Sequence, residues 1–207
     1  NQTGISTVNL FRKPATGGGA EEDLGVAGVN GFVQDWSKDG EWLLYQRQDP
    51  KTDMDLWLIP LKGDRKPVPY LASPFAEADG QFAPASGPPR WMAYDSNESG
   101  DLEVYIQEIP ARGAKYQVSS GGGGVPRWRA DGRELFYLTP DAKLMAVPIT
   151  LTPRVEIGTP REVFTNAVLS AYVPSRDGQR FLLNVPVGSD ASAPPATVVL
   201  NWASFRR

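Results

Sequence analysis

Short apolar runs alternate with turn-forming residues along almost the whole chain. The 21 glycines and 19 prolines are spread so evenly that the longest segment without either one spans residues 161–173. Helices of ordinary length have no room between such breaks. The runs are rich in β-branched and aromatic residues, which predicts an all-β fold of short strands. The clearest runs are residues 41–48, 55–61, 90–96, 102–109, 133–138, 143–149, 180–185 and 197–205.

One eleven-residue pattern occurs twice, as DWSKDGEWLLY at residues 35–45 and as RWRADGRELFY at residues 127–137. Trp36 and Trp128 lie 128 − 36 = 92 positions apart, and the aromatic Phe82 stands midway between them. We infer a repeat of 46 residues, which Tyr172 continues at a distance of 44. The turn glycines Gly40, Gly87, Gly132 and Gly178 recur at intervals of 47, 45 and 46 residues. A third marker is the P-x-x-G segment, which begins at Pro14, Pro60 and Pro110, at intervals of 46 and 50 residues.

A repeat of this length with four strands is typical of a β-propeller blade, whereas sandwiches and barrels have no reason to recur at a fixed long period. We therefore predict a β-propeller of four-stranded antiparallel blades. The chain holds about four and a half blades (207/46 ≈ 4.5) in one domain or propeller fragment, residues 1–207, which forms a partial ring or a small closed one. The expected blades are residues 31–74, 78–120, 125–166 and 171–205, and residues 5–27 are expected to form the outer two strands of an earlier blade.

The first full repeat shows how each part of a blade is encoded. Residues 31–37 are expected to form the inner strand, followed by a tight turn in which Asp39 bonds the backbone and Gly40 adopts a positive φ. Residues 67–73 are expected to form the outer edge strand, whose prolines hinder pairing with other chains.

Four tryptophans, Trp36, Trp42, Trp91 and Trp128, are expected to pack between neighbouring blades. A buried tryptophan removes on the order of 200 Å² from water, which is worth about 5 kcal/mol as an upper estimate. Such packing can hold the blades together without helices. Aromatic stacking on a sugar or base is the alternative function of these side chains.

Charge and composition exclude several classes of function. The net charge is −3 and the Lys and Arg residues are scattered along the sequence, so the chain lacks the basic patch that nucleic-acid binding needs. It has no cysteine for disulfides or thiolate metal sites, and no histidine for a Ser-His-Asp triad or for the commonest metal ligand. No apolar run approaches the roughly 18 residues of a membrane span. Because the first residue is Asn1, we expect a processed or excised piece of a longer protein.

Other candidate sites are better explained as turns. Residues 95–101 place oxygen-bearing side chains at the first positions of a calcium loop, but Ile106 stands where the bidentate Glu is needed. The glycine runs at residues 17–19 and 121–124 lack the Lys-Ser/Thr of a phosphate loop. The segment SKDGEW at residues 37–42 departs from the Asp-box of sialidase propellers because its glycine directly follows the aspartate. A glycosidase pair of carboxylates could be assembled from Asp35, Asp79 or Glu77, but nothing singles out a pair.

A propeller collects polar side chains along its central channel and on the rim formed by the loops that lead into the inner strands. This placement predicts where a ligand binds better than it predicts which ligand. In the alternative interpretation, these side chains only solvate the funnel. The expected channel and rim residues are Gln34, Asp35, Asp79, Gln81, Arg127, Arg129 and Tyr172.

The block at residues 36–45, with DLWLIPLKGDRKP at residues 55–67, RWRADGRELFY, and the late RDGQRFLLN and VVLNW, resembles the WD40-like repeats of the TolB type. The pattern is similar to the propellers found C-terminal to bacterial serine/threonine kinase domains, especially in acidobacteria. The resemblance covers nearly the whole chain. It implies a binding or sensing module outside the membrane, with no catalytic residues to carry over. Ser86 stands where the repeat expects Asp, and the segment before Asp177 has one extra residue, so both turns depart from the pattern.

We therefore expect a non-enzymatic binding or sensor propeller without cofactor or metal, in an extracytoplasmic location, with a cytoplasmic one left open. Its partner is expected to be a protein, a peptide or a small ligand at the central funnel, and not a nucleic acid or a membrane. Open propeller edges also favour self-association. The alternatives are the propeller of a hydrolase, either a glycosidase or the gate of a serine peptidase, and a purely structural spacer.

Overall fold

The structure is a computed structural model that describes residues 9–16, 18–26, 30–85, 87–111, 113–165 and 171–184. Every regular element within these ranges is a β-strand, and all paired strands are antiparallel. No helix in the described part of the chain has the length and hydropathy needed to cross a membrane.

Three sheets have at least four strands, and in each the chain runs from the inner strand outwards. In the third sheet, β13 pairs with both β14 and β15 along its length. The first sheet contains β3 (Gly31–Trp36), β4 (Trp42–Asp49), β5 (Asp53–Pro60) and β6 (Val68–Leu71). The second contains β7 (Glu77–Phe82), β8 (Trp91–Ser96), β9 (Glu103–Glu108) and β10 (Lys115–Gln117). The third contains β11 (Gly124–Trp128), β12 (Glu134–Leu138), β13 (Lys143–Thr150), β14 (Glu156–Ile157) and β15 (Arg161–Thr165).

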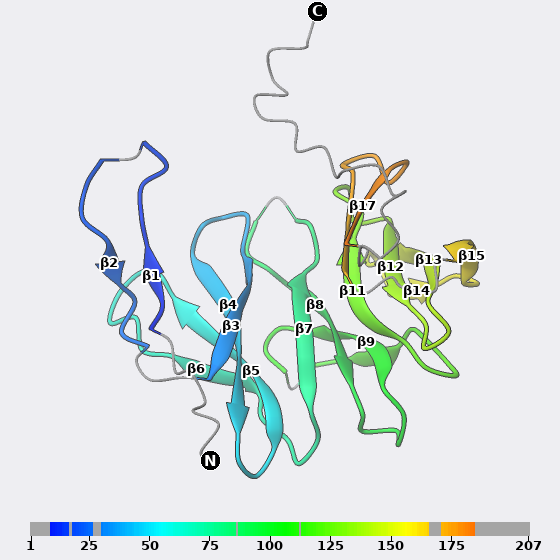
Figure 1. The fold of residues 1–207 in the computed structure, drawn as a ribbon, viewed down its shortest axis with the longest axis horizontal. Coiled ribbons are helices and arrows are strands. Elements are labelled where there is room, and N and C mark those ends of the chain that lie inside the picture. Colours follow the sequence, from blue (N-terminus) through cyan, green and yellow to red (C-terminus); the bar gives the residue numbers. More distant parts are fainter. Residues whose placement is uncertain are drawn as a thin grey trace, which may run out of the picture.

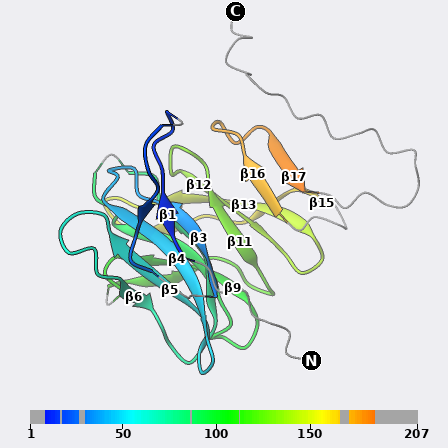
Figure 2. The same ribbon diagram turned by 60° about the vertical axis from the view of Figure 1, so that its left-hand side comes forward.

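Two smaller sheets have two described strands each. They are β1 (Phe11–Arg12) with β2 (Glu22–Asp23), and β16 (Ala171–Pro174) with β17 (Phe181–Asn184). The five sheets follow one another along an arc, with β1–β2 at one end and β16–β17 at the other (Figure 1). In the turned view the inner strands β3, β11 and β16 run in similar directions (Figure 2). The predicted fold class is confirmed as a partial β-propeller. The strand expected at residues 197–205 lies outside the described residues.

The inner hairpins of all four repeats share one register. The last residue pairs before the turn are Trp36–Leu43, Phe82–Met92, Trp128–Leu135 and Pro174–Phe181. Their first members stand at a constant interval of 46 residues. The prediction that Tyr172 continues the aromatic series was therefore wrong, because the turn sets the register of a hairpin and places Pro174 at that position.

The tight turn of the first repeat forms as predicted. Asp39 Oδ1 accepts a hydrogen bond from the Glu41 N–H at 3.0 Å, and Gly40 has a φ of 72°. An aspartate at this position caps the turn while the glycine takes the left-handed conformation without a steric cost. The same arrangement recurs at Asp131 with Gly132 and at Asp177 with Gly178.

Gly87 does not follow this pattern, which corrects its assignment to the series of turn glycines. It has no positive φ. The β7–β8 connection is longer than the other three, and its prolines Pro84, Pro88 and Pro89 cannot donate backbone hydrogen bonds. The hairpin still closes as the other three do, because the Ala83 N–H donates to the Trp91 carbonyl at 2.8 Å.

Buried apolar side chains fill each space between neighbouring sheets. Between the first and second sheets, the cluster comprises Leu44, Leu56, Leu58, Tyr70, Phe82, Met92, Tyr94 and Tyr105. Between the second and third, it includes Trp91, Ala93, Val104, Ile106, Trp128, Leu135, Tyr137 and Val147. Smaller clusters join β1–β2 to the first sheet and β16–β17 to the third. Each blade is therefore stabilised by the faces of its neighbours.

The predicted packing of the tryptophans holds at some positions and fails at one. Trp91 and Trp128 are buried, at 6% and 5% exposed, and Trp42 is partly buried. Trp36 is 49% exposed, although it stands at the repeat position of the buried Phe82 and Trp128. The prediction was wrong for Trp36 because its neighbour on that side, the sheet β1–β2, offers no inner strand among the described residues to cover it.

Two leucine truncations test this packing. Leu135 is fully buried between the second and third sheets, whereas Leu102 is 46% exposed. We expect Leu135→Ala to lower the free energy of unfolding by about 2–5 kcal/mol, and Leu102→Ala to change it by about 0.5 kcal/mol or less. Urea unfolding of the two variants measures both values. Equal losses would contradict a core that lies between the sheets.

Candidate binding site on the inner strands

The inner strands β3, β7, β11 and β16 lie next to one another in sequence order, β3 beside β7, β7 beside β11 and β11 beside β16. Each complete sheet has a bulge in its inner strand, between Val33 and Asp35, between Ala78 and Gln81, and between Gly124 and Arg127. A bulge re-aims side chains and leaves one backbone N–H outside the ladder. These bulges organise the polar contacts between blades.

One side chain of β3 and one of β7 each bond the backbone of the next blade. Asp35 Oδ2 accepts from the Phe82 N–H at 2.9 Å, and Gln81 Oε1 accepts from the Trp128 N–H at 2.7 Å. Donors and acceptors are both displaced by 46 residues, so this is the same contact in two successive repeats. Burial raises the pKa of Asp35, and the two backbone N–H donors at Phe82 and Trp36 partly offset this effect. Two predicted site residues, Asp35 and Gln81, therefore hold blades together.

A second repeated contact runs from the bulge to the strand β4 or β8 of the preceding blade. The Asp79 N–H donates to Gln46 Oε1 at 3.2 Å, and the Val125 N–H donates to Asp95 Oδ2 at 2.8 Å. Asp79 and Val125 have φ values of 50° and 55°. A β-branched residue such as valine rarely adopts this conformation, so the buried carboxylate of Asp95 compensates for local strain.

Arg127 occupies the repeat position of Asp35 and Gln81 but cannot make their contact, because a guanidinium has no hydrogen-bond acceptor. Its Nη1 donates to the Pro126 carbonyl at 2.7 Å, and its Nη2 lies 3.7 Å from Asp79 Oδ1. The side chains of Arg127 and Asp79 are 25% and 35% exposed. Two predicted site residues thus form one ion pair between neighbouring inner strands.

Tyr172 and Asp95 border this pair. The Tyr172 hydroxyl donates to the Val125 carbonyl at 2.9 Å, and burial raises the pKa of Tyr172 well above its ordinary value. Burial, and then the negative charge of Asp79, raise the pKa of Asp95 from 3.8 to about 7. The sequence places Asp95 only in a candidate calcium loop, and the signal for its other role is its position as an acidic residue in the apolar run that forms the fully buried strand β8.

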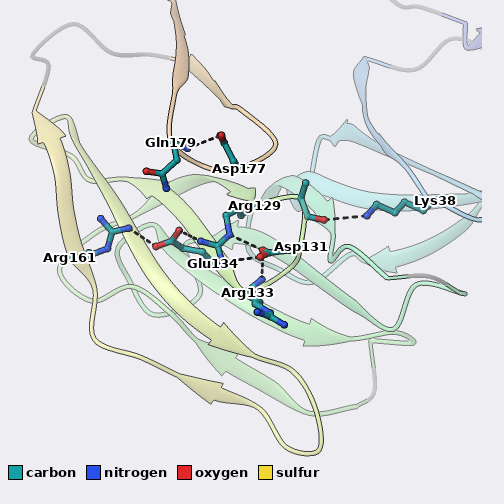
Figure 3. A network of polar contacts seen from close by, with 9 residues as sticks. Lys38, Arg129, Asp131, Arg133, Glu134, Arg161, Asp177 and Gln179 are labelled. Atoms are coloured by element: carbon teal, nitrogen blue, oxygen red, sulfur yellow. Dashed lines mark hydrogen bonds and ion pairs between the residues drawn. The ribbon is translucent and has the colours of Figure 1, made fainter. Parts of the chain in front are cut away.

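Arg129 lies in a separate network of polar contacts at the turn after β11 (Figure 3). Its Nε and Nη2 contact Asp131 at 2.8 and 3.0 Å, and its Nη1 contacts the buried Glu134 at 3.0 Å. Arg161 Nη2 donates to the same Glu134 at 2.6 Å. The Glu134 carboxylate on β12 therefore links Arg129, which follows β11, to Arg161 on β15.

The remaining predicted residue, Gln34, lines a separate cavity of about 410 Å³ between β3 and the β1–β2 sheet. A smaller cavity of about 170 Å³ is lined by Asp35, Gln81, Lys38 and Trp128, among others. It lies where the inner strands end and the tight turns begin, whereas the sequence placed the rim at the loops that lead into these strands. Across this rim, Lys38 Nζ donates to the Ala130 carbonyl at 3.4 Å (Figure 3).

The alternatives considered for chemistry find structural explanations. In the loop at residues 95–101, the Gly100 N–H donates to the Asn97 carbonyl, which forms a plain strand-to-strand turn. The Gly122 N–H donates to the buried Glu103 carboxylate at 2.9 Å. Glu77 is buried and accepts a hydrogen bond from the Ser73 hydroxyl. Within the described ranges, no group of three or more acidic side chains is placed to hold a metal ion.

Comparison with known proteins agrees with this architecture. No protein-family model and no curated protein matches the chain. Among solved structures, a TolB protein from Agrobacterium tumefaciens aligns with a TM-score of 0.59 and 13% identity over 74% of this chain and 55% of that chain. The chain shares the TolB-like propeller fold. It spans about half the length of the TolB protein, 55% of that chain. A prolyl endopeptidase structure aligns with a TM-score of 0.43 and 14% identity over 81% of this chain and 29% of that chain.

The raised pKa of Asp95 predicts a pH dependence of stability. Because the folded state binds this proton more tightly than the unfolded chain, the free energy of unfolding should fall as the pH rises from about 4 to about 7. Asp95→Asn cannot titrate and keeps an acceptor for the Val125 N–H, so its decline should be smaller than that of the unmodified chain. Urea unfolding across this pH range measures both slopes.

Asp101→Asn, an exposed change on the β8–β9 connection, provides the control and should leave the decline unaltered. Asp35, Asp55 and Glu77 also have pKa values raised by burial and contribute declines of the same sign, so the difference between variants isolates Asp95. An identical slope in Asp95→Asn and the unmodified chain would contradict this assignment.

Proposed function

We propose that this chain is a non-enzymatic binding propeller that recognises a protein, a peptide or a small ligand through the Arg127–Asp79 pair on its inner strands. The observation that carries the proposal is the exception at Arg127. At the same repeat position, the side chains of Asp35 and Gln81 accept hydrogen bonds from the next blade. The guanidinium of Arg127, in contrast, has N–H groups without an acceptor among the described residues.

The chemistry of the pair favours a peptide or a carboxylate-bearing ligand. A guanidinium donates two parallel hydrogen bonds to a carboxylate, or single bonds to backbone carbonyls. Asp79 beside it accepts from an amide or ammonium group. Partial burial strengthens both interactions relative to water. The strain at Asp79 and Val125 also fits a binding site, because backbone strain concentrates where ligands are held.

We further propose that residues 1–207 form a single propeller domain or propeller fragment of a larger signalling protein, located outside the cytoplasm. The resemblance to propellers that follow bacterial serine/threonine kinase domains supports this context. The alternative of a glycosidase propeller gains nothing from the carboxylates considered for it, because Asp35, Glu77 and Asp79 already have partners within the fold. The full-length reading frame tests the context, since an upstream kinase with a membrane span fits the proposal and a downstream α/β-hydrolase contradicts it.

Peptide binding tests the site directly. A library of fluorescent peptides with free or amidated C-termini identifies a binding sequence by fluorescence anisotropy. We expect Arg127→Ala to weaken binding of that sequence by about 10- to 100-fold, the effect of losing one or two charge-assisted hydrogen bonds. Arg127→Lys should recover only part of the affinity, because it loses the two-pronged geometry.

Two controls make the result specific. Arg154, whose side chain is 82% exposed and pairs only with Glu156 in the described structure, should be replaceable by Ala without effect on binding. Arg129→Ala should lower stability while leaving affinity unchanged. Unaltered affinity in Arg127→Ala, with the fold intact by circular dichroism, would refute the proposed site.

A further inference from the structure

The two half sheets at the ends of the arc are complementary parts of one blade. β1 and β2 stand 46 positions before β5 and β6, so they occupy the outer two places of a blade. Leu10 and Leu24 fill the core positions of Leu56 and Tyr70, which confirms the equivalence. β16 and β17 stand 46 positions after β11 and β12, the inner two places. Joined, the two pairs would make one four-stranded blade.

Within one copy the two half sheets do not meet. Figure 1, whose longest axis is horizontal, places β1–β2 and β16–β17 at opposite ends of the arc. In the part of the chain that the structure describes, β1 pairs only with β2 and β17 pairs only with β16. Among the described residues, each half sheet therefore presents a free strand edge, which is a template for pairing with another chain.

Apolar exposure is concentrated at the same two ends. Leu182 on β17 is 75% exposed, whereas its equivalents on the second strands of the three complete blades are at most 1% exposed. Those equivalents are Leu44, Ala93 and Phe136, defined by their pairing with the inner strand. Of the nine large apolar side chains exposed in the described residues, six lie at these ends: Phe11, Phe32, Val33 and Trp36 at one, and Val173 and Leu182 at the other.

The exposed residues at the two ends match as partners. In the first blade-to-blade space, Leu44 shares a core cluster with Phe82 of the following blade. In the next space, Ala93 shares a cluster with Trp128 of the following blade. In the third space, Phe136 shares a cluster with Tyr172 of the following blade. The repeat assigns the pair after that to Leu182 and Trp36, which lie at opposite ends of one copy. A second copy brings them together and continues the same blade-to-blade interface.

We propose that two copies of this chain join head to tail, with β16–β17 of each copy completing the blade that contains β1–β2 of the other. The described residues of each copy contribute three complete blades and two half blades, so the proposed ring has eight blades, within the range of 4 to 8 that propellers typically close with. Closure also removes both free strand edges. This inference does not depend on which ligand the Arg127–Asp79 pair recognises.

Mass and mutation provide the first test. Light scattering coupled to gel filtration should give twice the mass of the chain. Leu182→Asp should raise the dimer dissociation constant at least tenfold, because it places a charge against Trp36 of the other copy. Leu102→Asp, an equally non-conservative change at an exposed leucine away from both ends, should leave the dimer intact.

Disulfide formation tests the register. Tyr45 pairs with Trp57 in the first blade, and the same register places Leu183 of one copy opposite Phe11 of the other. Opposed Cα atoms in antiparallel strands lie about 4.5–5.5 Å apart, which suits a disulfide. The chain has no cysteine of its own. The double variant Phe11→Cys with Leu183→Cys should therefore oxidise to a covalent dimer, whereas Val68→Cys with Leu183→Cys should not.

Three results would overturn the proposal. The first is a monomer at all concentrations. The second is a dimer that Leu182→Asp leaves intact. The third is a disulfide between positions 11 and 183 within one chain, which would mean that a single copy closes its own ring. Because these readouts are mass and cross-linking, they stay separate from the peptide-binding test of the Arg127 site.

Discussion

Face-to-face packing of neighbouring sheets at a constant register is the interaction on which this structure depends. No blade can bury both of its faces alone, so each one contributes apolar side chains to the cluster on either side. Gly80 shows how close the contact is. A Cβ at this position of β7 would lie 2.7 Å from Leu44 Cδ2 in the preceding blade and 3.1 Å from the nearest Leu56 methyl carbon. The repeat of 46 residues in the sequence reflects this requirement for close packing between blades.

Polar groups follow the same register, and their roles depend on what each position can donate or accept. Asp35 and Gln81 accept the backbone N–H of the next blade, so their polarity serves the fold. Arg127 at the equivalent position lacks an acceptor, and the contact between the third and fourth inner strands is made instead by the Tyr172 hydroxyl. In such a repeat protein, we look for function at a position where one repeat lacks the structural contact that the other repeats make.

The fold was predictable from the sequence because strand length, turn chemistry and period all indicate the same architecture. The turn at Asp39 and Gly40 and the burial of Trp91 and Trp128 needed no more than local patterns. The exposure of Trp36 was not predictable, because it depends on which strands flank β3 in space. The register at Pro174 was misjudged because aromatic identity was followed instead of the turn position.

The site was predicted only in part. Sequence placed Asp79 and Arg127 on inner strands, and the structure brings them together. The sequence could not distinguish this pair from Arg129, which was predicted to belong to the same site. The guanidinium of Arg129 is bound by Asp131 and Glu134 through contacts that depend on the hairpin geometry. Asp95 was missed as a partner of the bulge because its role depends on a backbone N–H of the next blade, which no side-chain pattern records.

A double-mutant cycle at Gly80 and Leu44 tests the central claim most directly. Gly80→Ala in the unmodified chain should lower the free energy of unfolding by about 1–3 kcal/mol, the usual effect of overfilling a packed core. In a Leu44→Ala background, the removed side chain leaves room for the new methyl group, so the same change should cost at least about 1 kcal/mol less. Equal costs in both backgrounds, within the roughly 0.3–0.5 kcal/mol expected of independent sites, would contradict blade-on-blade packing at this register.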